Sequence, residues 1–225
     1  MLGLPKSTEF NKRIPKQKFY ENLSVTPAIK KAFTEQIKII YWRNKLAATT
    51  LNIASGEQVT EIEVFEVKLT SPSLDENVLR LIDREIPYHI LFLLEWDRKY
   101  RAVMGYKEAV VPGKTAFKVD RYYYTKWMNE TELPLRLEGL ALDAVWENLI
   151  MQVGGIELEH GNSLNEQIAL EDLKAKLVKD IINFQNKARK EKQPNKKFEL
   201  VTKAKELKKE LSELEMQVKD GTVYD

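Results

Sequence analysis

Two runs of apolar residues at helical spacing occupy the last third of the chain, and they constrain the fold more than any other feature. Both runs advance in steps of three and four residues. The first contains Leu170, Leu173, Leu177, Ile181 and Phe184, and the second contains Leu200, Ala204, Leu207, Leu211, Leu214 and Val218. This spacing places apolar side chains on one face of a helix, and two such helices joined by a short turn bury these faces against each other. The sequence therefore predicts an antiparallel, coiled-coil-like helical hairpin over residues 163–220.

Residues 26–155 carry helix and strand patterns that predict an α+β domain. A helix is expected over residues 27–44, because Thr26 can cap it and proline fits its first turn. Two strand patterns follow, at residues 47–53 and 59–69. A glycine-containing turn separates them, so we expect these two strands to form a β-hairpin.

The second half of this domain is predicted to add a helix, three strands and a closing helix. Ser73 and Glu76 match a capping box, which indicates a helix start. Short connections then join three strand patterns, and such connections favour an antiparallel meander. A last helix is expected to begin near Leu137 and to end at Gly154. The expected result is a mainly antiparallel, five-stranded mixed sheet with helices.

Residues 1–25 are predicted to form an extended basic arm. Its cations are Lys12, Arg13, Lys16 and Lys18. One interpretation is that these side chains contact nucleic acid or an acidic partner. The other is that the arm packs Phe19 and Tyr20 against the domain while its charges stay in solvent.

Composition excludes several classes of protein. The chain has no cysteine, so disulfides, thiolate catalysis and cysteine-ligated metals are excluded. It has two histidines and no run of eighteen apolar residues, so we expect neither a multi-histidine metal site nor a membrane span. The N-terminal residues lack the apolar stretch of a signal peptide, so a cytoplasmic location is expected. We expect no metal and no cofactor.

A cluster of cations marks the turn of the predicted helical hairpin. Its members are Lys187, Arg189, Lys190, Lys192, Lys196 and Lys197, with Glu191 among them. The net charge of the chain is +2, so any contact with nucleic acid must come from local patches of this kind. The alternative is a solvated turn, because the dipole of a helix also favours cations near its C-terminus.

The segment Glu66-Val67-Lys68 is the strongest candidate for chemistry. Glu-x-Lys on a strand resembles half of the signature of a large nuclease family that binds magnesium through carboxylates. Such a site needs a second acid, because a hard divalent ion prefers several oxygen ligands. The preceding strand pattern offers no acid, and one strand too few precedes the motif; Glu35 is the remaining candidate. A surface glutamate and lysine are the simpler interpretation of the same residues.

Several segments resemble an uncharacterised bacterial family, domain-of-unknown-function family 4391, over about residues 1–155. The segments that carry the resemblance are FTEQIKIIYWRNKLAATTLNI, EIEVFEVKL, LIDREIPYHILFLLE, MGYKE and YYYTKW. The resemblance implies a gene neighbourhood shared with helicases and DNA methyltransferases, similar to restriction-modification or phage-defence islands. It implies no catalytic residues.

These observations favour a non-enzymatic accessory or scaffold subunit of a bacterial DNA-processing or antiviral defence system. The hairpin is expected to dock onto a helicase or methyltransferase, or onto a second copy of the chain. The basic turn and the N-terminal arm are candidate contacts for nucleic acid. Two alternatives stay open: a magnesium-dependent nuclease that uses Glu35, Glu66 and Lys68, and a simple nucleic-acid-binding protein.

Overall fold

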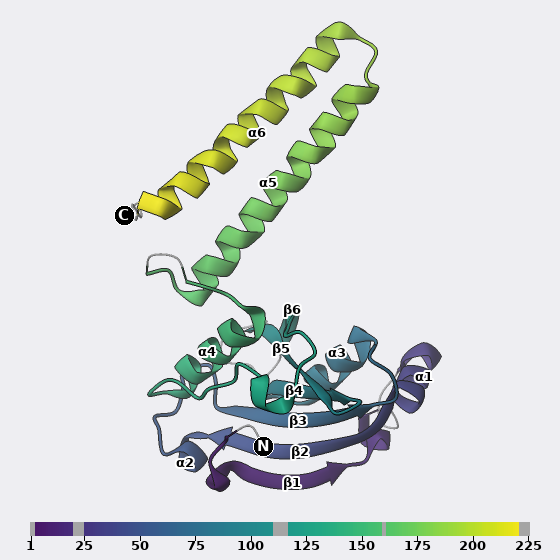
Figure 1. The fold of residues 1–225 in the computed structure, drawn as a ribbon, viewed down its shortest axis with the longest axis vertical. Helices are drawn as coiled ribbons and strands as arrows, with labels where there is room; N and C mark the ends of the chain where they lie inside the picture. The colour runs from purple at the N-terminus through teal and green to yellow at the C-terminus, as the bar shows by residue number, and fades with distance from the viewer. Residues whose placement is uncertain (1–2, 20–24, 110–116, 159–160, 221–225) are drawn as a thin grey trace. The chain divides into compact units, whose positions relative to one another are not determined.

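The computed structural model describes residues 3–19, 25–109, 117–158 and 161–220. The chain divides into two compact units, Met1–Ile156 and Glu157–Asp225 (Figure 1). Across the described residues, no helix combines the length and the apolar character needed to cross a bilayer.

A six-stranded mixed sheet forms the centre of the first unit. Its strands are β1 (Glu9–Ile14), β2 (Ile37–Ala47), β3 (Glu61–Leu69), β4 (His89–Trp96), β5 (Lys99–Ala109) and β6 (Phe117–Tyr124). They lie side by side in chain order, with β1 and β6 at the edges. Only β3 and β4 are parallel neighbours in this sheet, because a helix separates them in the chain and returns β4 in the same direction.

Helices cover both faces of this sheet. The helices of the first unit are α1 (Pro27–Gln36), α2 (Ala48–Leu51), α3 (Glu76–Glu85) and α4 (Leu142–Gly154). Buried residues of α1 and α3 pack with Phe65 and Val67 of β3 in one apolar cluster. On the opposite face, Trp146 of α4 packs against the rings of His89 and Tyr106. Successive strand residues point to opposite faces, so β3 contributes to both layers.

The predicted helix over residues 27–44 is wrong beyond Gln36. Residues 37–47 form β2, which pairs with β1 and β3, and the expected strand at 47–53 is replaced by the helical turn α2. A register shift between Ile37 and Ile39 lets both Ile37 and Ile40 face the core. This bulge therefore produces a three-residue apolar step that imitates a helix. The β-branched and aromatic residues of the segment suit a strand better.

The N-terminal arm is also corrected by the structure. Residues 9–14 form β1, so the sheet has six strands where five were expected, and the arm is not separate from the α+β unit. Phe19 is buried, as one of the two interpretations required, whereas Tyr20 lies outside the described residues.

Helix ends show which local signals were reliable. The side chain of Thr26 accepts a hydrogen bond from the backbone of Ile29, and Gly155 ends α4 in the left-handed region at φ 63°, as predicted. The helix expected at Ser73 is instead capped by Asp75, two residues later. The last helix begins at Leu142 and not near Leu137.

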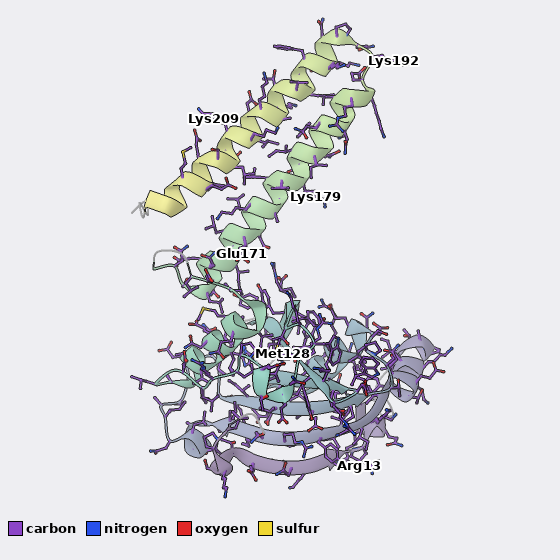
Figure 2. All side chains as sticks on the ribbon, viewed as in Figure 1. Arg13, Met128, Glu171, Lys179, Lys192 and Lys209 are labelled. Carbon is purple, nitrogen blue, oxygen red and sulfur yellow. The ribbon has the colours of Figure 1, made fainter. Side chains whose placement is uncertain are left out.

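The second unit is the predicted helical hairpin. It consists of α5 (Leu164–Lys190) and α6 (Pro194–Asp220), with Lys192 in the turn (Figure 2). Ser163 caps α5 and Glu166 completes a capping box. The seam between the helices buries Leu177, Ile181 and Ala204 of the predicted runs, together with Ala188. Leu173, which was also predicted on the buried face, is 39% exposed.

Candidate functional site

A charged cavity lies on the face of the sheet opposite α1 and α3. Its volume is about 170 Å³. Strand residues line most of it: Arg43, Asn44, Glu66, Leu93 and Tyr100. Glu9 and Asn11 of β1 also line it, and Leu4 and Glu130 complete it from outside the sheet.

Strand alternation directs Glu66 toward this cavity. Phe65 and Val67 belong to the apolar cluster beneath α1 and α3, so Glu66 and Lys68 point to the other face. The parallel register of β3 and β4 then sets Lys68 directly beside Glu95. Two glutamates and one lysine from neighbouring strands are thereby brought together.

An ion-pair network joins these side chains. The Nζ atom of Lys68 lies 3.2 Å from Oε1 of Glu66 and 3.4 Å from Oε2 of Glu95, and the guanidinium of Arg43 contacts Oε2 of Glu66. Glu66 is only 5% exposed, so its charge depends on these partners. Burial opposes the charged form of Lys68, yet the two carboxylates together raise its pKa above the ordinary value.

Arg43 reaches Glu66 because β2 is irregular at this point. Trp42 pairs with Phe65 and Asn44 pairs with Val64, which leaves Arg43 as the extra residue of a bulge. Its guanidinium also lies 4.7 Å from the centroid of the Tyr41 ring. The bulge thus aims a cation at Glu66.

Tyr100 brings a hydroxyl to the same cavity. Burial raises its pKa above the ordinary value, and the nearby carboxylates of Glu66 and Glu130 raise it further. The phenol therefore stays protonated at neutral pH and can donate a hydrogen bond to an oxygen in the cavity.

The structure separates the three residues proposed for a nuclease. Glu66 and Lys68 lie together, but Glu35 belongs to α1, which packs on the other face of the sheet, and its carboxylate lies 3.9 Å from Lys31. The acid beside Lys68 is instead Glu95. β1 and β2 supply two strands before the motif, so the strand that was judged missing is present.

Sequence reasoning missed Glu95, Arg43 and Tyr100. The pairing of Glu95 with Lys68 depends on the parallel register of two strands that are separated by α3. The one available signal was a charged residue at the next-to-last position of each strand pattern, Lys68 in EIEVFEVKL and Glu95 in HILFLLEW. Across the part of the chain that the structure describes, no three His, Cys, Asp or Glu side chains are grouped to hold a metal ion.

The predicted basic residues of the arm have different roles. Lys12, Arg13 and Lys18 are exposed, and Lys12 Nζ lies 4.2 Å from the centroid of the Phe10 ring. Lys16 donates to the backbone oxygens of Phe33, Thr34 and Ile37, at 3.2, 3.3 and 2.5 Å. These carbonyls end α1, where a helix lacks donors, so Lys16 caps this helix and is withdrawn from any anionic partner.

The cations of the hairpin turn are all exposed. They are Lys187, Arg189, Lys190, Lys192, Lys196 and Lys197. Lys187 Nζ lies 5.9 Å from the centroid of the Phe184 ring. The turn therefore presents positive charge to solvent, as the sequence predicted.

A second polar cluster is buried between α3 and the last two strands. Lys107 Nζ lies 2.9 Å from Asp83 Oδ1, and the hydroxyl of Tyr122 donates to Asp83 Oδ2. The side chains of Asp83 and Lys107 are 0% and 1% exposed. Each charge compensates the burial of the other, so this cluster fixes α3 on the sheet.

A family model described as "Domain of unknown function (DUF4391)" matches residues 2–211. The match includes most of the helical hairpin as well as the α+β unit. Neither curated proteins nor solved structures give a match to the chain.

Proposed function

The chain belongs to the DUF4391 family, and we propose that it is a non-enzymatic accessory or scaffold subunit of a bacterial DNA-processing or phage-defence system. In this proposal the α+β unit is the body of the protein. The helical hairpin docks onto a larger helicase or DNA methyltransferase.

The observation that carries the proposal is the apolar surface left on the hairpin. Its seam already buries one row of side chains, yet large apolar residues of both helices stay exposed. They are Leu173 (39%), Val178 (44%), Ile182 (52%), Phe198 (73%), Val201 (37%) and Met216 (61%). These exposed side chains support a contact with another protein, because a large apolar surface is typical of such interfaces.

The family supports the class of partner. Its resemblance implies neighbouring genes for helicases and DNA methyltransferases, and proteins encoded together often assemble. The exposed cations of the hairpin turn suit a complex that works on DNA, because lysine and arginine neutralise phosphates.

Co-purification of the full chain with the neighbouring helicase and methyltransferase tests the docking role. We expect a stable complex with one of them, and loss of it when Ile182 and Phe198 are both changed to Ser. Asn183→Ser, an exposed neighbour on α5, is the matched control. The proposal fails if neither enzyme binds the wild-type chain.

DNA contact by the hairpin turn has its own test. Changing Lys190, Lys192, Lys196 and Lys197 together to Glu should abolish binding of duplex DNA. Wild-type affinity should fall as salt rises, because phosphate contacts release counterions. A Lys12→Glu, Arg13→Glu variant distinguishes DNA binding by the hairpin turn from DNA binding by β1, because only the second would be lost in it. Absence of any binding at low salt would remove DNA contact from the proposal.

The cavity at Glu66 favours a second candidate, a magnesium-dependent nuclease. The specific observation is that Glu95 lies beside Lys68 and so offers the acid that the motif needs. Glu66 and Glu95 have the oxygen ligands that a divalent ion prefers, and Lys68 and Tyr100 could orient a phosphate. A bound ion would supply Lewis-acid chemistry there. The fit is partial, because Arg43 and Lys68 already neutralise both carboxylates.

Divalent-ion binding and DNA cleavage test this candidate together. Calorimetry with magnesium alone should show binding that Glu66→Ala abolishes and that Arg43→Ala strengthens, since Arg43 competes for Glu66. Cleavage of plasmid DNA should be lost in Glu66→Ala and in Lys68→Ala, while Glu35→Ala stays active. If Glu66→Ala and Lys68→Ala cleave DNA as well as the wild type does, the site is excluded.

A further inference from the structure

A groove runs along one side of the hairpin, between α5 and α6 near the turn. Its volume is about 450 Å³. The floor is apolar and consists of Ala188, Val201 and Ala204. Alanine at two buried seam positions leaves room that larger side chains would fill, which explains why the groove lies there.

Cations line the rim of this groove. Arg189 comes from α5, whereas Lys197, Lys205 and Lys208 come from α6, and Gln185 completes the wall. No acidic side chain contributes to the described lining. The rim therefore attracts an occupant with negative charge on two flanks.

Exposed apolar residues continue the floor along the same side. Helical steps of three and four residues lead from Arg189 and Gln185 back to Ile182 and Val178 on α5. On α6, Phe198 lies one turn from Val201 on that side. Ile182, Val178 and Phe198 are 52%, 44% and 73% exposed. Apolar residues of both helices therefore lie on this side of the hairpin, together with Arg189 of α5 and the lysines of α6.

We propose that this groove binds an amphipathic helix of a partner protein, with an apolar stripe and acidic flanks, as the third helix of a bundle. A third helix would bury Val178, Ile182 and Val201 while its carboxylates meet Arg189 and Lys205. This inference rests on the proposed docking role of the hairpin and specifies the chemistry of the segment that it binds.

Two other occupants fit less well. A phosphate backbone would pair with the cations but offers no apolar surface to cover Val178 and Ile182. A second copy of the chain would present the same cationic side to the groove, and like charges repel. An acidic amphipathic helix satisfies both the floor and the rim.

The test uses the full chain and designed peptide probes. The first probe is a labelled helical peptide about three heptads long, with Leu and Ile on one face and Glu on both flanks. A second probe has Lys in place of Glu, and a third keeps Glu but has Ser in place of the apolar residues. Fluorescence anisotropy should show binding of the first probe, and binding at least about tenfold weaker for each of the others.

Variants of the protein locate the binding surface. Lys205→Glu with Lys208→Glu should weaken binding of the first probe about tenfold or more, and so should Ile182→Ser. Lys176→Glu is the control, because this exposed cation lies on the opposite side of α5. Circular dichroism checks that each variant keeps its helices.

Three outcomes overturn the inference. They are equal binding of the Glu and Lys probes, competition by duplex DNA that depends on the same variants, or light scattering that shows a dimer lost in Lys205→Glu with Lys208→Glu. A further outcome would overturn this inference without affecting the proposed docking role: the helicase or methyltransferase still co-purifies with the Lys205→Glu, Lys208→Glu variant. In that case the docking role stands and the partner uses another surface.

Discussion

Between about pH 6 and pH 8, ionisation of Glu63 should lower the free energy of unfolding, and replacing Glu63 by glutamine should abolish this loss. Glu63 is 1% exposed, and its carboxyl group lies close to that of Glu61. Burial, followed by the nearby Glu61, raises the pKa of Glu63 from 4.5 to about 8. The folded protein therefore holds this carboxyl group protonated at a pH where the unfolded chain has ionised it.

The sign follows from proton binding. Above pH 4.5 the unfolded state loses the proton and the folded state keeps it until about pH 8, so rising pH favours unfolding across this interval. Each pKa unit corresponds to about 1.4 kcal/mol, so the free energy of unfolding should fall by about 2 kcal/mol between about pH 6 and pH 8. His89 also titrates in the unfolded state near the lower limit, but it is present in both proteins and cancels in the comparison.

Urea unfolding followed by tryptophan fluorescence measures the effect. The four tryptophans all lie in the α+β unit, so the signal reports on the unit that contains Glu63. From pH 6 to pH 8, wild type should lose about 2 kcal/mol of stability relative to Glu63→Gln. The exposed Glu57→Gln variant should behave like wild type. Parallel pH profiles for wild type and Glu63→Gln would refute the reasoning.

Three further predictions concern polar side chains of the α+β unit, and urea unfolding measures each of them. Burial and the charge of Lys107 lower the pKa of His89 to about 3. The stability of His89→Phe relative to wild type should therefore rise by about 1.4 kcal/mol for each pH unit below about 6.5. A difference in stability that does not change with pH would contradict this. Lys107→Met leaves Asp83 buried without its cation and should cost about 3–5 kcal/mol, much of it recovered by adding Asp83→Leu. Asp143 accepts hydrogen bonds from the backbone of Glu57, Gln58 and Val59, so Asp143→Ala should cost about 2 kcal/mol, and an unchanged midpoint would show that these bonds are dispensable.

The helical hairpin was predictable from sequence because its information is local. The apolar steps, the Ser163 cap and the basic turn all lie within two adjacent segments, and the structure follows them. A long regular period leaves few alternatives. The six-stranded sheet was less predictable, because β1 has a mostly polar sequence and becomes a strand only through its pairing with β2.

The candidate site was predictable only in part. Glu66 and Lys68 are two residues apart on one strand, so their common face followed from alternation alone. Glu95 and Arg43 reach them through a parallel register and a bulge, and neither feature is visible in a single segment. The mistaken choice of Glu35 has the same origin, because the side of the sheet that α1 covers is set by tertiary packing.

The position of β1 at the edge of the sheet has a consequence for solubility. An open strand edge can template the addition of a strand from another molecule, and lysine or arginine on that edge opposes such stacking. Lys12 and Arg13 lie on this strand and are exposed; Figure 2 labels Arg13. They therefore protect each molecule from joining its neighbours edge to edge. Removing β1 would uncover β2, and its longer and more apolar edge would then be open to the addition of a strand from another molecule.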